Sequence, residues 1–576
     1  MCQRGAAACT NLYCPCSRRP CYPARVTESA AVPIAATPLA PARKPARSGG
    51  AAALVAAGIL LSRLAGLLRQ RIFGHYLGTS AAADAYNAAF RIPNFLQNLL
   101  GEGVLSASFI PVFASLRGKG KEDEARAVAG AVAGLLGLAT GAFALLGILA
   151  TPWLIDAIAP GFKGETRELT IHLVRVFFPG ISLLVLSAFC IGVLNSHHRF
   201  FLSYAAPVLS SAAVVVALLV GGHGLRLGQF PLAVVVAWGA VCGAALQLAV
   251  QLPTVLGLLR SQSAPFRLSL GRGNADVAEV VKNFLPVVAG KGVVQLSAYV
   301  DTLIASWLPV GTVAAFAYAQ LIYTLPVSLF GMAVSAASLP SMSASQGEEG
   351  AAEKLRLQLA SGLRSIAYPV VPSVAAFLVL GDVICAALFQ TGKFGPAQVR
   401  YVWLILAGST VGLLAATLGR LYSSAFYALR DTRTPLRFAA LRVLLTGGLG
   451  LFAGLSLPRL LHVDASFGAA GLTASAGVAG WVEFALLRRA LRGRIGSVDL
   501  PLGFQLRLWA SAVLAALAGL ALRFVLPAGP SFFAQPVPRA ILVFALFGTV
   551  YLGATLALRI PEATFALGRV RRLIRR

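Results

Sequence analysis

The chain has 576 residues, of which 57% are hydrophobic and only 12% are charged, and its mean hydropathy is +0.77. Water cannot solvate a surface of this composition, which excludes an ordinary soluble protein and places the chain in a lipid bilayer. The net charge of +28 is spread over short basic runs between apolar segments. This distribution is typical of the loops of a membrane protein and argues against a nucleic-acid partner.

Residues 1–50 are rich in Ala, Pro, Arg and Ser, without an uninterrupted apolar run or a helical period. This composition predicts a disordered cytoplasmic tail and not a cleaved signal peptide. Five of the eight cysteines lie in the first 21 residues, and none forms a CxxC pair. The sequence therefore does not indicate a zinc or redox site, and we expect no metal.

After residue 50, windows of ~19 residues detect about fourteen apolar stretches that are long enough to span a bilayer as helices. Basic residues are concentrated in alternate loops, such as the loop from Arg117 to Arg126, and in the carboxy-terminal tail. This alternation obeys the positive-inside rule only if the number of spans is even and both termini are cytoplasmic. We therefore predict an all-α integral membrane protein with about fourteen transmembrane helices.

Two short patterns recur at an offset of roughly 230–240 residues. The segment from Gly103 to Pro111 is similar to that from Gly331 to Pro340, and Ser187-Ala-Phe is similar to Ser424-Ala-Phe. Each repeat displaces the pattern by six spans, which predicts two six-helix lobes of the same orientation around a central cavity. The expected parts are the tail (1–50), the two lobes (51–270 and 271–495), and two appended helices with a basic tail (496–576).

Charged residues lie within or beside the expected spans, namely Arg63, Arg69, Asp84, Arg91, Glu102, Lys291 and Asp301. A charge at the bilayer centre costs about 2.5–3.5 kcal/mol, so these side chains are expected to face a protein-lined, water-filled cavity. Asp84, Arg91 and Glu102 are spaced by whole helical turns and share one face, as do Lys291 and Asp301. Such a cavity suits an anionic substrate. The alternative is a closed network of ion pairs that only holds the helices together.

Other chemistries are not indicated. The sequence contains no GxxxxGK[ST] loop, no HExxH motif and no GxSxG motif. ATP is therefore not the expected direct driver, and we do not expect an enzyme. A lone carboxylate such as Asp301 is the expected place for a coupling ion, and Lys291 is expected to neutralise part of an anionic substrate.

The amino-terminal part carries a series of short motifs, Ser62-Arg63-x-x-Gly66-x-x-Arg69, Asp84-Ala-Tyr, Arg91-Ile-Pro-Asn94, Glu102-Gly103 and Phe109-Ile-Pro-Val112. This series resembles the signature of the MurJ/MviN family, and the similarity extends over nearly all of the chain after residue 50. The family consists of lipid II flippases, and it belongs to a superfamily that also contains MATE-type and polysaccharide exporters. Its members add two helices, which form a groove for the lipid tail, to two six-helix lobes.

The resemblance implies a function. It implies translocation of lipid II, the undecaprenyl-diphosphate-linked precursor of peptidoglycan, across the bacterial cytoplasmic membrane by alternating access. The expected partners are lipid II, membrane lipids and cell-wall synthesis proteins. By the same resemblance, Arg63, Arg69 and Asp84 match positions that are important for activity, and the arginines are expected to attract the diphosphate.

The chain departs from the family at two places. Gln97-Asn98 stand where many relatives carry an Arg pair, and Gln320-Leu321 stand where relatives carry Asp-Arg, whose arginine lines the cavity. We expect Lys291 to replace part of that charge, although an ammonium lacks the bidentate geometry of a guanidinium. The departures leave other functions open: export of another polyprenyl-linked saccharide or of drugs, or a non-transporting scaffold for cell-wall enzymes.

The driving force also stays open in the sequence. Some relatives bind sodium through acidic or Asn residues of the seventh and eleventh helices. Asp301 would serve in the seventh helix, but the eleventh, around Arg442, offers no carboxylate. Coupling to sodium and coupling to the membrane potential are therefore both expected alternatives.

Overall fold

The computed structural model describes residues 49–197, 199–260, 267–344, 350–498, 500–526, 532, 535–564 and 568. The expected tail, 1–50, therefore lies almost wholly outside the described residues. Within the described ranges the chain is helical and has no β-strand, which confirms the predicted all-α class.

The helices alternate with short turns, and three of them run into π-helical turns at Val220–Gly224, Val327–Met332 and Phe452–Ser456. Their bounds are α1 Gly49–Leu77, α2 Ala81–Leu100, α3 Glu102–Gly118, α4 Glu122–Ile158, α5 Gly164–Ser196, α6 Phe200–Leu219, α7 Gln229–Leu259, α8 Ala275–Ser306, α9 Thr312–Pro326, α10 Ala333–Ala344, α11 Ala351–Phe389, α12 Pro396–Thr410, α13 Leu413–Ala428, α14 Arg433–Leu451, α15 Leu457–Leu460, α16 Phe467–Ile495, α17 Leu502–Val525 and α18 Pro536–Ala557.

Local sequence explains where the helices begin and end near the amino terminus. The hydroxyl of Ser80 accepts a hydrogen bond from the amide of Ala83 at 3.3 Å and so caps α2. Gly78 has a positive φ of 57°, which allows the tight turn between α1 and α2. Gly101 separates α2 from α3. The α1–α2 turn and the break between α2 and α3 are thus set by Gly and Ser residues, which are poor helix formers.

Ten helical segments in the described part of the chain are long and apolar enough to cross a membrane. The number is eleven if α12 and α13, which are bent by 42° at their junction, count as one span. The chain is therefore a multi-pass membrane protein, while the count of fourteen stays a prediction. The three further expected spans correspond to α1, α2 with α3, and α8, the helices that carry Arg63, Arg91 and Asp301.

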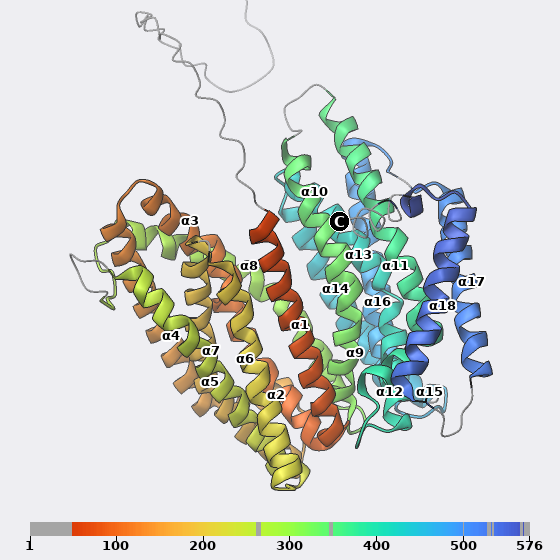
Figure 1. Ribbon diagram of the computed structural model, residues 1–576, viewed down its shortest axis with the longest axis horizontal. Coiled ribbons are helices and arrows are strands. Elements are labelled where there is room, and N and C mark those ends of the chain that lie inside the picture. Colours follow the sequence, from red (N-terminus) through yellow and green to blue (C-terminus); the bar gives the residue numbers. More distant parts are fainter. Residues whose placement is uncertain are drawn as a thin grey trace, which may run out of the picture. The chain divides into compact units, whose positions relative to one another are not determined.

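The helices form two packed groups (Figure 1). In the first, α5 contacts α2, α3, α4 and α7, and α7 contacts α6. In the second, α16 contacts α12, α13 and α14, and α11 contacts α12 and α13. Helix α8 packs against α3 and α4 of the first group and against α14 and α16 of the second. The exact division at residues 270 and 495 stays a prediction.

The two appended helices, α17 and α18, pack against each other and against α11 (Figure 1). A separate apolar cluster fills this contact and includes Leu380 and Val543, both fully buried. An ion pair of 2.6 Å between Arg523 of α17 and Asp382 of α11 adds a polar tie. The appended pair is thus anchored on one helix of the second group.

Candidate functional site

A cavity of about 640 Å³ lies between helices of both groups. Residues of α1, α2, α8, α9, α12, α13, α14 and α16 line it. Among the described residues, the charged side chains on its wall are Arg63, Arg69, Arg91, Asp301 and Arg442. Four arginines against one aspartate give this wall a net charge of +3.

Arg63 and Arg69, both expected from the sequence, lie on the cavity wall from α1. Arg63 is exposed to the cavity, and Arg69 is partly buried. Neither guanidinium has a hydrogen bond or an ion pair to another described residue, so both can receive an external anion. A guanidinium suits phosphate because its planar fork donates two parallel N–H bonds.

Arg91 and Asp301 face the same cavity from α2 and α8. The Tyr299 hydroxyl donates a hydrogen bond of 3.2 Å to the Arg91 carbonyl oxygen and ties the two helices together. The Tyr299 ring also packs edge-on against Phe95, with 5.3 Å between the centroids. One carboxylate oxygen of Asp301, Oδ1, is buried and has no hydrogen-bond partner among the described residues.

Asp84 does not line the cavity. Its side chain is 3% exposed, Oδ2 accepts a hydrogen bond of 2.5 Å from the Gly311 amide, and Oδ1 accepts one of 2.7 Å from the Ala314 amide. Asp84 therefore caps the first turn of α9. It shares a helix face with Arg91, but seven residues displace it by about 10.5 Å along the axis, to the level where α9 begins.

Further hydrogen bonds surround this cap and join the α1–α2 turn to α9 and to the α11–α12 turn. We call this set the end seam. Besides the Asp84 cap it consists of the Tyr318 hydroxyl to the Gly78 carbonyl (3.0 Å), His75 Nδ1 with the Thr391 hydroxyl (2.8 Å), the Lys393 amide to the His75 carbonyl (2.9 Å), and the Arg71 guanidinium to the Ala387 and Leu388 carbonyls (2.5 and 3.1 Å).

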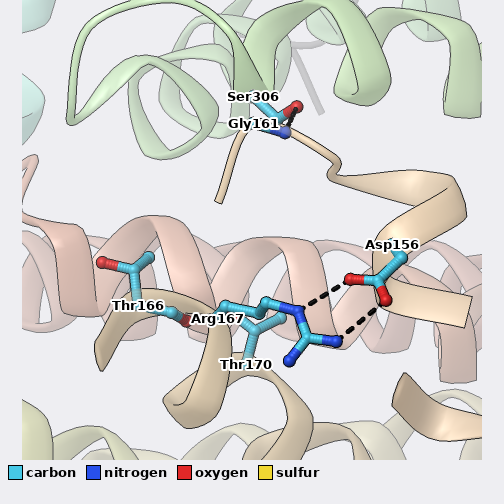
Figure 2. Close-up of polar contacts among 6 residues, drawn as sticks. All are labelled: Asp156, Gly161, Thr166, Arg167, Thr170 and Ser306. Carbon is cyan, nitrogen blue, oxygen red and sulfur yellow. Dashed lines mark hydrogen bonds and ion pairs between the residues drawn. The ribbon is translucent and has the colours of Figure 1, made fainter. Parts of the chain in front are cut away.

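The α4–α5 turn makes a similar contact with the end of α8 (Figure 2). The Gly161 amide donates a hydrogen bond of 3.0 Å to the Ser306 hydroxyl, and a Cβ on Gly161 would overlap the Ser306 carbonyl. Arg167 braces the turn with two hydrogen bonds to Asp156, of 2.7 and 2.8 Å (Figure 2). The α4–α5 turn of the first group is therefore packed closely against the end of α8.

Two expected site residues lack a described side chain. Glu102 is the first residue of α3, and Lys291 lies in α8, but the side chains of both are outside the described part of the structure. Their expected roles stay predictions.

The sequence reasoning missed Arg442 as a cavity residue. Arg442 of α14 forms an ion pair of 3.2 Å with Glu483 of α16. A charge inside an apolar helix is the signal that singled out Arg63, and it applies equally to Arg442 and Glu483. Arg442 does not stand out in the sequence because Arg433 and Arg437 precede it. The three arginines together resemble a basic loop that ends at Arg442.

Comparisons with known proteins agree with this architecture. The lipid II flippase MurJ of Burkholderia cenocepacia is 32% identical over 509 residues, which cover 86% of this chain and 94% of that protein. A solved structure of lipid II flippase MurJ in an inward closed conformation superimposes with a TM-score of 0.69 at 21% identity, over 88% of this chain and 99% of that one. An inward-facing MATE family multidrug transporter of the MOP superfamily gives a TM-score of 0.62 at 19% identity, over 77% of this chain and 98% of its own.

The solved structures establish the fold, and the family follows from the sequence. Residues 73–535 match the family model described as lipid II flippase MurJ, which is most of the chain. This match includes most of the helices that line the cavity, from α2 to α16. The chain therefore belongs to the MurJ family of lipid II flippases, as the motifs from Ser62 onward indicated.

Proposed function

We propose that this protein translocates lipid II across the bacterial cytoplasmic membrane as a multi-pass inner-membrane flippase with both termini in the cytoplasm. The observation that carries the proposal is the cavity between the two helix groups, with four arginines and one aspartate on its described wall. Family membership identifies the substrate, and the positive charge of the cavity wall explains why its anionic head group enters. It is a transporter, because its work is binding and conformational change without a covalent step.

The diphosphate of the lipid carrier is the part of the substrate that the arginines bind. Arg63 and Arg69 offer unpaired guanidinium groups, and Arg91 adds a third positive charge from α2. Each forms charge-assisted hydrogen bonds with phosphate oxygens, which are about twice as strong as neutral ones. A neutral or cationic ligand gains nothing from this wall, so the charge also provides selectivity.

The end seam acts as the closed outer gate. With both termini inside, α1 runs outward, so the α1–α2 turn and the Asp84 cap lie at the outer face. The cavity then takes its substrate from the inner side, and translocation requires the end seam and the Gly161–Ser306 contact to separate. Most of these bonds involve a backbone amide or carbonyl, which water satisfies once the gate opens. Asp84 is thus a positioning residue of the gate.

The membrane potential is the driver that fits the wall charge. An interior that is negative favours outward movement of the anionic head group, and it draws the emptied, positive cavity back to the inner side. Each elementary charge that crosses the full potential contributes about 2.3 kcal/mol per 100 mV. A sodium ion fits less well, because Arg91 and Arg442 share the wall with Asp301 and repel a cation. We therefore assign no step to sodium.

Replacement of a depleted resident lipid II flippase tests the proposal. Cells that produce wild type are expected to grow and keep their shape, whereas cells that produce Arg63→Ala at equal membrane levels are expected to lyse. Glu165→Gln, an exposed change at the start of α5, is the matched control and should behave as wild type. Failure of well-expressed wild type to sustain growth would point to an exporter of another substrate or to a scaffold.

A further inference from the structure

The part of the cavity wall formed by α9 carries no charge. Its described polar lining includes Gln320 and Thr324, and Leu321 lies beside them. A diphosphate that contacts only Arg63, Arg69 and Arg91 would be held by α1 and α2 alone. Transport between two groups needs a contact on the second as well, because a ligand shifts an equilibrium between conformations only through differential contacts.

Arg442 of α14 is the described cation that the second group places on the cavity wall. Its Nη1 lies 3.2 Å from Oε2 of Glu483, and the two side chains are 39% and 17% exposed. Glu483 does not line the cavity, so it lies behind Arg442 and uses one nitrogen of the guanidinium. The remaining N–H donors have no other described partner and are open to a ligand.

The ionised side chains around Arg442 carry a net positive charge. Arg420 of α13 lies close enough to interact electrostatically with both Arg442 and Glu483, and it does not line the cavity. Asp301 also interacts electrostatically with Arg442 and with Arg91. Three guanidinium groups therefore share two carboxylates, Glu483 and Asp301, which leaves this cluster with a net charge of +1. A carboxylate shared in this way orients Arg442 without neutralising it, so the guanidinium still attracts an anion.

The Arg442–Glu483 pair is one of several contacts that hold α14 against α16. Asp431, in the turn before α14, forms an ion pair of 2.6 Å with Arg494 of α16. Near the other end, Gly454 and Gly468 pack so closely that a Cβ on Gly468 would overlap the Gly454 carbonyl oxygen. An intramembrane charge is costly, and one that faces a cavity and is not the sole contact between its helices is well placed to bind a ligand.

We propose that Arg442 is the diphosphate-binding residue of the second helix group and takes the role of the cation that α9 lacks. The inference rests on the proposed function. It assigns to Arg442 the two parallel N–H bonds that a guanidinium offers to phosphate oxygens. With Arg442 of α14 on one side, and Arg91 of α2 with Arg63 and Arg69 of α1 on the other, the substrate head bridges both groups.

Binding of farnesyl diphosphate to the full-length protein in detergent, with farnesol as the neutral probe, tests the inference. Arg442→Gln is expected to weaken farnesyl diphosphate binding by about 10-fold or more, as expected for a lost charge-assisted hydrogen bond, and to leave farnesol binding unchanged. Arg437→Gln, an exposed arginine on the same helix away from the cavity, is the matched control. Leu321→Arg in the Arg442→Gln protein is expected to restore binding, because it returns a guanidinium to the same cavity.

Two further variants separate ligand binding from packing. Glu483→Gln keeps the cation and is expected to lose much less binding than Arg442→Gln. The double variant Arg442→Gln with Glu483→Gln leaves no unpaired carboxylate behind and is expected to fold and still bind weakly. Wild-type affinity in the double variant, or equal losses in the two single variants, overturns the inference. Failure of wild type to replace the depleted flippase, with Arg442-dependent diphosphate binding intact, rejects the proposed function instead.

Discussion

The Asp84 carboxylate accepts a hydrogen bond of 2.5 Å from the Gly311 amide and thereby fastens α2 of the first helix group to the start of α9, which packs against α12 of the second. A group that the sequence presents as a cavity charge is instead the cap of a helix that begins more than two hundred residues later. The contact links substrate access to the position of the two groups, because it cannot persist when they separate at this end.

Asp84→Asn is expected to weaken the closed end seam. An asparagine in this place turns an NH₂ donor toward one of two backbone donors, and a buried polar group left unsatisfied costs about 1–3 kcal/mol. Transport is expected to fall, and a cysteine introduced at Thr79 is expected to become more reactive from the outer side. Unchanged labelling together with full growth support would contradict the role of Asp84 as a gate residue.

A covalent cross-link across the end seam is expected to stop transport reversibly. His75 Nδ1 and the Thr391 hydroxyl are 2.8 Å apart, so cysteines at these positions lie within reach of a short bifunctional methanethiosulfonate reagent when the gate is closed. In a background free of other cysteines, the reagent should arrest lipid II translocation, and reduction of the mixed disulfides should restore it. The two proteins that carry only one of these cysteines are the controls and should keep full transport. Full transport in the cross-linked protein would mean that this end never opens.

Lys291→Ala tests the earlier expectation that this lysine compensates for the uncharged Gln320-Leu321 pair. A partial loss of transport is expected if the ammonium contributes to the charge of the cavity, and the loss should be smaller than that of Arg442→Gln because an ammonium lacks bidentate geometry. Growth support at normal expression gives the measurement. Full activity of Lys291→Ala would mean that Arg442, and not Lys291, compensates for the uncharged Gln320-Leu321 pair.

Acid is expected to remove part of the stability that Asp431 provides. Hydrogen bonding from Thr434, and then the Arg494 guanidinium, hold the pKa of the Asp431 carboxyl below its usual range. A lowered folded-state pKa stabilises the protein above the unfolded value of about 3.9, and that contribution is lost as the pH falls toward the folded value. The difference in Tm between wild type and Asp431→Asn should therefore shrink below about pH 4. A constant difference would contradict the assignment.

The sequence predicts the helices and the first half of the cavity well because both depend on local patterns. Arg63, Arg69 and Arg91 are recognised as charges in apolar helices, and the structure places all three on the cavity wall. The partners of Asp84 could not be predicted, because helical spacing relates residues of one helix and says nothing about which distant amide faces them. Arg442 was missed for a different reason, since adjacent loop arginines concealed a charge that lies one turn deeper.

The most direct test of the account is translocation of fluorescent lipid II in proteoliposomes that contain the full-length protein, with an imposed inside-negative potential. The account predicts transbilayer movement by wild type that slows when the potential is dissipated and is lost in Arg63→Ala. Equal rates for wild type, Arg63→Ala and protein-free vesicles would contradict the claim that arginines in this cavity carry the diphosphate across the membrane.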